Sequence, residues 1–98
     1  MHLAIDDKKN LPGLDRICRT DVEGKTALEQ GGITHLYMDN DLGCKLEGWE
    51  ILEWGFKKGL IPNTVTLITM NPVGYQRMVL ALENEGYTGI GDDTWNKK

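Results

Sequence analysis

Four aspartates stand at places where they could share one chemical task. Asp6 and Asp7 follow a short apolar run, Asp39 follows another, and Asp41 comes soon after. Carboxylates that gather within a few ångströms repel one another, so they either take up protons or hold a cation. Hard oxygen ligands on open loops, with no cluster of His or Cys nearby, suit Mg²⁺ or Mn²⁺ better than Zn²⁺. These residues therefore predict a divalent-cation site.

Polar and basic residues elsewhere extend the predicted chemistry to a phosphate group. Thr69 ends a third apolar run, and its hydroxyl could donate to a phosphate oxygen, while Lys9 or Arg77 could neutralise another. The segment 71–74 has two interpretations, and the first is simply a turn followed by the start of a helix. In a functional interpretation, Asn71 hydrogen-bonds the bound group and the start of the helix offers free N–H groups to an anion.

A calcium-binding loop is the rival interpretation of the second acidic segment. Positions 1, 3, 9 and 12 of such a loop are matched by Asp39, Asp41, Glu47 and Glu50. Position 6 is Cys44, where a calcium loop has Gly, and the preceding residues favour a strand over a helix. We therefore reject an EF-hand.

The elements that must position these residues alternate between short apolar runs and helical segments, which favours βαβ units around a parallel sheet. We predict strands at 2–5, 15–19, 33–38, 64–68 and 87–90, and helices at about 21–30, 49–58 and 74–85. Gly43 and Gly48 are predicted to be turn residues, and the polar tail 91–98 is predicted to be loose. Because ligands bind outside the carboxyl ends of parallel strands, we expect the aspartates to meet on one rim.

Length and composition limit the class of protein. Ninety-eight residues suit a single domain over 1–98, and a formal net charge of −4 makes nucleic acid an unlikely partner. Cys18 and Cys44 are too few for a disulfide scaffold and are predicted to be reduced thiols, with Cys18 in the core. No targeting or membrane-spanning segment is visible, so we expect a cytoplasmic protein without a membrane partner. The oligomeric state is left open.

Taken together, the motifs resemble the receiver domains of response regulators, and in more detail the cyclic-phosphate-processing receiver family. That family has an LDD-type start, a D-H-D-L-G loop, a G-[YW] helix entry and an H-S-x-N-P-x-G segment before a helix with Arg-Met. The counterparts here, in the same order, are Ile5-Asp6-Asp7, Asp39-Asn40-Asp41-Leu42-Gly43, Gly48-Trp49, Thr69-Met70-Asn71-Pro72-Val73-Gly74 and Arg77-Met78. The resemblance spans about residues 2–90.

This resemblance implies both a fold and a set of roles. The implied fold is a small Rossmann-like α/β domain of the receiver or flavodoxin type, a three-layer sandwich around a short parallel sheet that is truncated at its C-terminal end. By resemblance, Asp6 and Asp7 would hold Mg²⁺, and Asp39 would be a metal ligand and the phosphoryl acceptor. Thr69 would contact the phosphoryl group, and Asn71 would belong to the phosphate-handling segment. The implied partner is a small molecule that contains phosphate.

Three departures from the family pattern support an alternative function. Asn40 and Ile68 stand where the family has histidines that could shuttle protons, and no lysine lies between Tyr87 and Asp93, where a receiver has one. The alternative is a catalytically degenerate module that binds and regulates another protein, which would suit a small virus-encoded protein. Candidate anchors are aromatic: Trp54, Tyr75, Tyr87 and Trp95. A structural domain without a ligand is the third possibility.

Overall fold

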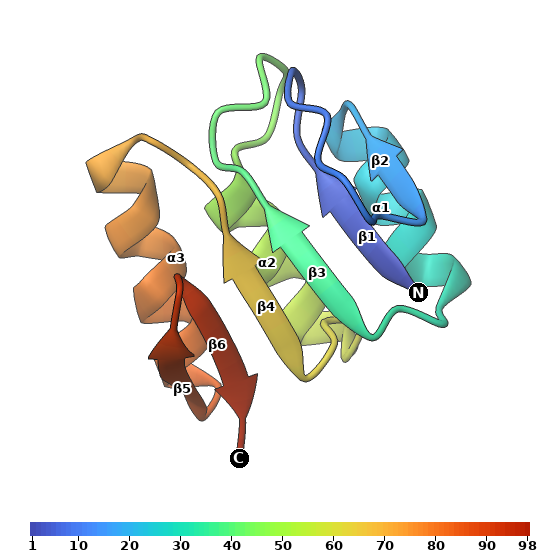
Figure 1. Ribbon diagram of the computed structural model, residues 1–98. Coiled ribbons are helices and arrows are strands. Elements are labelled where there is room, and N and C mark those ends of the chain that lie inside the picture. The colour runs from blue at the N-terminus through green and yellow to red at the C-terminus, as the bar shows by residue number, and fades with distance from the viewer.

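The computed structural model describes residues 1–98, which form six strands and three helices (Figure 1). The strands are β1 (His2–Ile5), β2 (Arg16–Cys18), β3 (His35–Met38), β4 (Thr64–Leu67), β5 (Tyr87–Gly91) and β6 (Thr94–Lys97). The helices are α1 (Asp21–Gln30), α2 (Gly48–Lys58) and α3 (Pro72–Asn84). None of the three helices has the length and apolar character that a membrane span requires.

All six strands belong to one sheet in the order β2-β1-β3-β4-β6-β5. The first four strands of this order run parallel, as the βαβ pattern predicts. The α/β class and the receiver- or flavodoxin-like arrangement are thereby confirmed. The sheet is nevertheless mixed, because β6 runs antiparallel to both β4 and β5.

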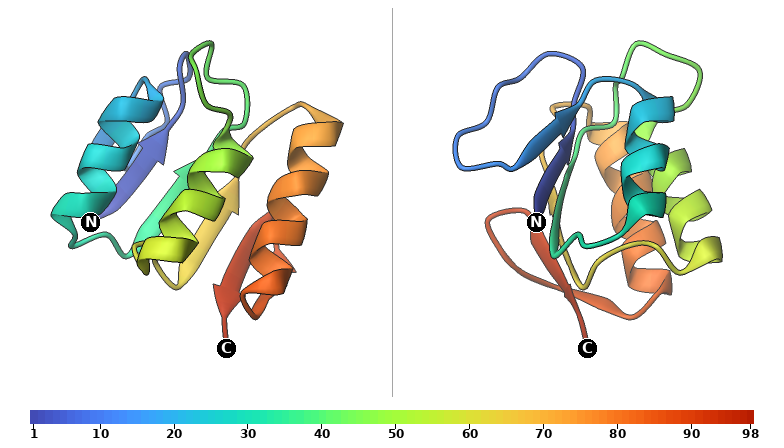
Figure 2. Two further views of the ribbon diagram at one scale, coloured as in Figure 1. Left: turned by 180° about the vertical axis from the view of Figure 1, so that it is seen from behind. Right: turned by 90° about the vertical axis from the view of Figure 1, so that its right-hand side faces the viewer.

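The three helices cover the same face of the sheet, so the molecule has two layers (Figure 2). The predicted three-layer sandwich is therefore wrong. Residues 6–15, which connect β1 to β2, form a loop that contains Pro12 and Gly13, and neither residue favours a helix. The core lies between the helices and the sheet, where Leu3, Leu36 and Val65 are fully buried.

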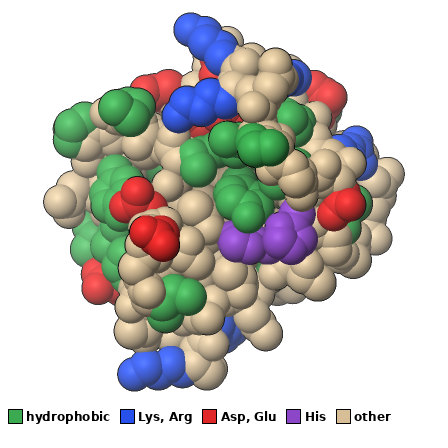
Figure 3. Space-filling model, viewed as in Figure 1, with side chains coloured by type: hydrophobic (Ala, Val, Ile, Leu, Met, Phe, Trp, Pro, Cys, Tyr) green, Lys and Arg blue, Asp and Glu red, His purple; other side chains and the backbone are tan.

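On the face of the sheet that the helices leave uncovered, polar and aromatic side chains stack on one another and form hydrogen bonds. The ring of His35 stacks on that of Tyr37 at a centroid distance of 4.2 Å and lies 5.0 Å from the ring of His2. Its Nε2 atom lies 2.7 Å from the Thr66 hydroxyl, which hydrogen-bonds Thr94 in turn. Burial, and secondarily the charge of His2, lowers the pKa of His35. The two histidines lie side by side near the middle of this uncovered face (Figure 3).

The C-terminal tail is the largest departure from the expected elements. Residues 91–98 were expected to be loose, but Thr94–Lys97 form β6, which lies between β4 and β5. Trp95 pairs with Val65 in register and packs against the core, so a single apolar side chain ties this polar strand to the helical layer. Asp92 and Asp93 both have positive φ angles, which two-residue hairpin turns commonly require.

Helix α3 begins at Pro72, two residues before the predicted start. Asn71 is its N-cap, and the side-chain oxygen of Asn71 accepts hydrogen bonds from the backbone N–H groups of Val73 and Gly74. Pro72 is the first helical residue, where a missing N–H group has no consequence. The expected turn and helix start are therefore present at this segment, and the functional role of Asn71 stays a prediction.

Tyr87 is only 4% exposed, so it is a core residue and not the exposed anchor that the sequence suggested. Its hydroxyl donates to the carbonyl oxygen of Pro62 at 2.6 Å. Burial, and to a lesser extent the charge of Glu85, raises the pKa of Tyr87 to about 12. The folded protein therefore keeps this phenol protonated at pH values where the unfolded chain ionises it.

We expect the Tyr87→Phe variant to lose less stability at alkaline pH than the wild-type protein. The contribution of the raised pKa is complete below pH 10 and is lost as the pH rises from 10 toward about 12. At neutral pH the variant should be less stable by about 1 kcal/mol, because it lacks the hydrogen bond to Pro62. Urea unfolding at pH 7 and pH 11 measures both effects. Equal losses in the two proteins between these pH values would contradict the prediction.

Candidate functional site

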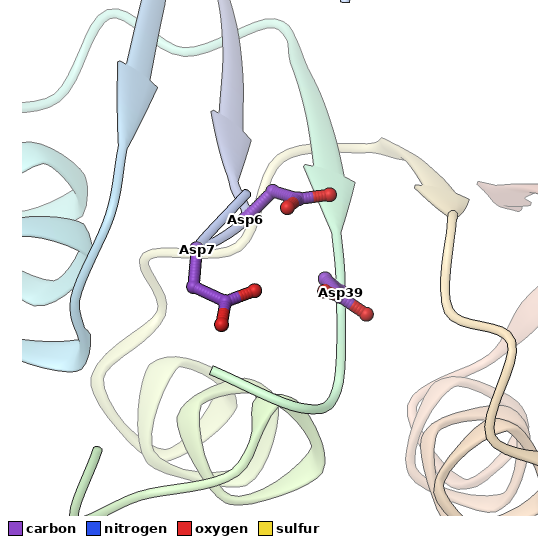
Figure 4. Close-up of side chains that lie close together, drawn as sticks. All are labelled: Asp6, Asp7 and Asp39. Carbon is purple, nitrogen blue, oxygen red and sulfur yellow. The ribbon is translucent and has the colours of Figure 1, made fainter. Parts of the chain in front are cut away.

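The pairing of β1 with β3 brings Asp6 next to Asp39. Ile5 and Met38 are register partners in this parallel pair, and the Asp39 N–H group donates to the Ile5 carbonyl at 3.0 Å. Each strand ends one residue before its aspartate, so both carboxylates emerge on the same rim. Figure 4 shows the Asp6 side chain pointing from the end of β1 toward β3.

Three of the four aspartates identified from the sequence form one cluster. Asp6, Asp7 and Asp39 each offer an oxygen atom, and these atoms lie within 4.8 Å of one another. Asp6 is 1% exposed and Asp39 is 9% exposed, while Asp7 is half-buried. The sequence argument that separate strand ends converge on one rim is therefore correct for these residues.

Asp6 has one satisfied oxygen and one unsatisfied oxygen. Its Oδ1 atom accepts hydrogen bonds from the backbone N–H groups of Lys8 and Lys9, each at 2.9 Å. Its Oδ2 atom is buried and has no hydrogen-bond partner. Native proteins satisfy nearly all buried polar atoms, and a bound ion is one accepted explanation of an exception. The cluster thus has an oxygen suited to a cation.

The pKa of the Asp39 carboxyl reflects its position in this cluster. Burial, followed by the nearby charge of Asp6, raises the pKa of the Asp39 carboxyl. Hydrogen bonds from the Asn40 backbone and the Thr69 hydroxyl, together with the charge of Lys9, offset this effect only in part. The folded protein therefore holds the proton of Asp39 more firmly than a solvated aspartate would.

An open cleft of about 430 Å³ contains the cluster. Its lining residues are Asp6, Asp7, Lys8, Lys9, Asp39, Asp41, Gly43, Thr69 and Met70. Thr69 reaches the cleft because β4 lies beside β3, where the Ile68 N–H group donates to the Met38 carbonyl at 3.0 Å. The cleft therefore combines carboxylates, a hydroxyl and two ammonium groups on one rim of the sheet.

A comparison with protein families shows which family the chain is related to. The model of the cyclic-phosphate processing receiver domain matches residues 1–84. The chain belongs to this family. None of the curated proteins compared with the chain matches it. The β5–β6 hairpin of this receiver domain lies beyond the matched residues.

Two further predicted residues of the receiver domain lie at the rim of the cleft. The Asn71 side-chain amide donates to Oδ1 of Asp41 at 3.1 Å, which joins the loop after β3 to the start of α3. Asp41 is exposed and is not one of the three clustered carboxylates. The structure therefore places Asp41 beside Asn71, where it can shape the mouth of the cleft.

Arg77 is the predicted site residue that the structure leaves outside the cleft. It is exposed on α3, and its guanidinium group lies 4.8 Å from the ring centroid of Trp49 on α2. An arginine over a tryptophan ring is a cation–π contact between helices. Arg77 therefore belongs to the helical layer in this conformation.

Asn40 stands where the family loop has a histidine. Its buried side chain connects the loop after β3 to the start of α2. Its side-chain oxygen accepts from the Trp49 N–H group at 3.2 Å, and its amide donates to Glu47 at 3.1 Å. Glu47 and Glu50 form a capping box at the start of α2, which accounts for the acidic spacing that resembled a calcium loop. Sequence reasoning missed this role of Asn40, because its partners come from the next helix.

Gly48 also has a role that differs from the predicted one. Gly43 is in the left-handed region with φ of 63°, as a turn residue would be, but Gly48 has no positive φ angle. A Cβ atom on Gly48 would lie 2.1 Å from the carbonyl oxygen of Asp39. Because Gly48 has no side chain, the start of α2 can lie directly against the backbone of Asp39.

Proposed function

We propose that this receiver domain binds a divalent cation, Mg²⁺ or Mn²⁺, at Asp6, Asp7 and Asp39, and a phosphate group in the same cleft. The buried, unpartnered Oδ2 atom of Asp6 carries the proposal, because Asp6 belongs to one cluster with two further carboxylates. No hydrogen-bond donor of the protein satisfies this oxygen, so a purely structural role does not explain its burial.

The donor set fits a hard cation. The cluster offers carboxylate oxygens, and its half-open position leaves room for water ligands, which Mg²⁺ usually keeps. When bound, such an ion supplies positive charge that holds and polarises an oxygen of the phosphate group. The other contributions come from side chains of the cleft.

The side chains support two kinds of phosphate chemistry. In one, an Asp39 oxygen bonds to phosphorus while the bond to the leaving oxygen breaks, and that oxygen departs with the electron pair. In the other, water bonds to the phosphorus of a cyclic phosphate with Asp39 accepting its proton, and the released ring oxygen is protonated. In both, the Thr69 hydroxyl donates to a phosphoryl oxygen. The intact mass of the protein distinguishes the two reactions, because the first adds a phosphoryl group to the protein and the second leaves its mass unchanged.

The test of the binding proposal is a titration with Mg²⁺ and Mn²⁺ followed by NMR. We expect the amide signals of Asp6, Asp7 and Asp39 to shift, with Asp7→Asn weakening the affinity about tenfold because one ligand is lost. The matched control is Glu29→Gln, which removes the same charge from the exposed surface of α1. An unchanged wild-type spectrum at millimolar Mg²⁺ and Mn²⁺ would contradict the proposal.

Binding to another protein is the second candidate function. The observation in its favour is a set of exposed apolar side chains near the cleft and along α3: Met70 at 88%, Val73 at 64% and Leu80 at 58% exposure. Such side chains can contribute to a protein interface. If no metal response is found, this alternative is the function that the surface still supports.

A further inference from the structure

Lys9 reaches across the cleft from the loop between β1 and β2. Its Nζ atom donates to the carbonyl oxygen of Ile68 at 2.7 Å, although the two residues belong to opposite sides of β3 in the strand order. Ile68 directly precedes Thr69, and Lys9 lines the cleft together with Thr69 and Asp39. An ammonium group has three donors, so the bond to Ile68 leaves two that can meet a ligand.

The charge balance of the cleft favours such a cation. Three carboxylates and a phosphate dianion together carry more negative charge than one divalent ion neutralises. We propose that Lys9 neutralises the phosphate group in this cleft, and that Arg19 is the positioning residue that holds Lys9 there. This assignment rests on the proposed function.

Arg19 fixes the backbone of the loop that carries Lys9. Its Nη1 atom donates to the carbonyl oxygen of Lys9 at 2.7 Å and to that of Asp6 at 3.3 Å, and its Nη2 atom donates to the Asn10 side chain. The Lys9 N–H group is bound to Asp6 at the same time. The loop is therefore held at two points on either side of the Lys9 side chain, although no helix supports it.

The neighbouring cations are less well placed for this role. The guanidinium group of Arg19 is occupied by the loop, and Arg77 lies over Trp49 on the helical layer. Lys8 lines the cleft, but unlike Lys9 it makes no side-chain bond across to the strand that leads to Thr69. Lys8 is therefore a matched control for charge alone.

The experiment measures two affinities in each protein: that for Mg²⁺ alone, and that for inorganic phosphate at saturating Mg²⁺, followed by the amide signals of Thr69 and Asn71. We expect Lys9→Met to weaken phosphate binding about tenfold, because a charge-assisted hydrogen bond is lost. Its affinity for Mg²⁺ should be equal to or higher than that of the wild-type protein, because a repelling charge is gone. Lys9→Arg should restore most of the phosphate affinity, and Lys8→Met should change it less than twofold.

Arg19 is tested in two backgrounds. Arg19→Met should weaken phosphate binding in the wild-type background but change it less than twofold in Lys9→Met, because a positioning residue acts through the group it positions. Equal phosphate affinities in Lys9→Met and wild type, a parallel loss in Lys8→Met, or a loss of Mg²⁺ binding in Lys9→Met would overturn the assignment. A wild-type protein that binds neither Mg²⁺ nor phosphate would instead contradict the proposed function.

Discussion

We expect Asp39→Asn to make the metal-free protein more stable and, at the same time, to remove its stabilisation by Mg²⁺. The variant replaces a carboxylate that repels the charge of Asp6 with a neutral amide. A gain of about 1 kcal/mol would raise Tm by roughly 5 °C in a domain of this size. The wild-type protein should gain about 1.4 kcal/mol from Mg²⁺ at ten times its Kd, and the variant almost nothing.

The pH dependence gives a second readout of the same carboxyl group. Its pKa is raised in the folded protein, so its contribution to stability is complete below the unfolded pKa and is lost as the pH rises through the folded pKa. Thermal unfolding without metal should therefore show wild type falling relative to Asp39→Asn as the pH rises from about 4 toward neutrality. Glu29→Gln serves as the control, with no such difference. A variant that is less stable than wild type at pH 7 without metal would contradict this account.

Gly48→Ala is expected to destabilise the domain by about 3 kcal/mol or more. Replacing a glycine inside a helix by alanine is ordinarily favourable by up to about 1 kcal/mol. Here the new Cβ atom would lie 2.1 Å from the Asp39 carbonyl oxygen and 2.9 Å from Cα of Asn40. Both contacts are with backbone, so either the start of α2 or the loop after β3 must move.

Gly89→Ala is the matched control for this substitution. A Cβ atom there would meet only the Trp95 ring, at 3.5 Å, and Gly89 has no positive φ angle. We expect a change below about 1 kcal/mol for this variant in urea unfolding. A midpoint for Gly48→Ala that equals that of Gly89→Ala would show that the start of α2 moves away without penalty. If Gly48→Ala folds, a weakened response to Mg²⁺ would show that the displacement reaches Asp39.

The convergence of the aspartates was predictable because it depends on local rules. An apolar run that ends in Asp marks a strand end, and parallel strands share a carboxyl rim, so Asp6 and Asp39 could be placed together without coordinates. The oxygen of Asp6 that lacks a partner could not be predicted, because that depends on which backbone N–H groups turn toward the other oxygen.

The two corrections to the fold have different causes. The third layer was implied by the family resemblance, whereas residues 6–15 themselves contain a turn cluster and no helical periodicity. Strand β6 was missed because Trp95 is its only apolar residue, yet the alternation Thr94-Trp95-Asn96 after the Asp92-Asp93 turn has the period of a half-buried strand. A strand with one apolar side chain gives only a weak pattern, and the pairing of this strand with β4 shows that it forms.

The position of β6 determines when the sheet can be completed. Strand β4 pairs with β3 on one side, but its other neighbour is supplied by Thr94–Lys97, which come after every other strand in the sequence. While those residues emerge from the ribosome or are clipped away, β4 presents an open row of hydrogen-bonding groups, the kind of template that recruits foreign strands and starts aggregation. The β5–β6 hairpin therefore covers this edge of the central strand, and labels are best kept away from Thr94–Lys97 so that β6 can dock.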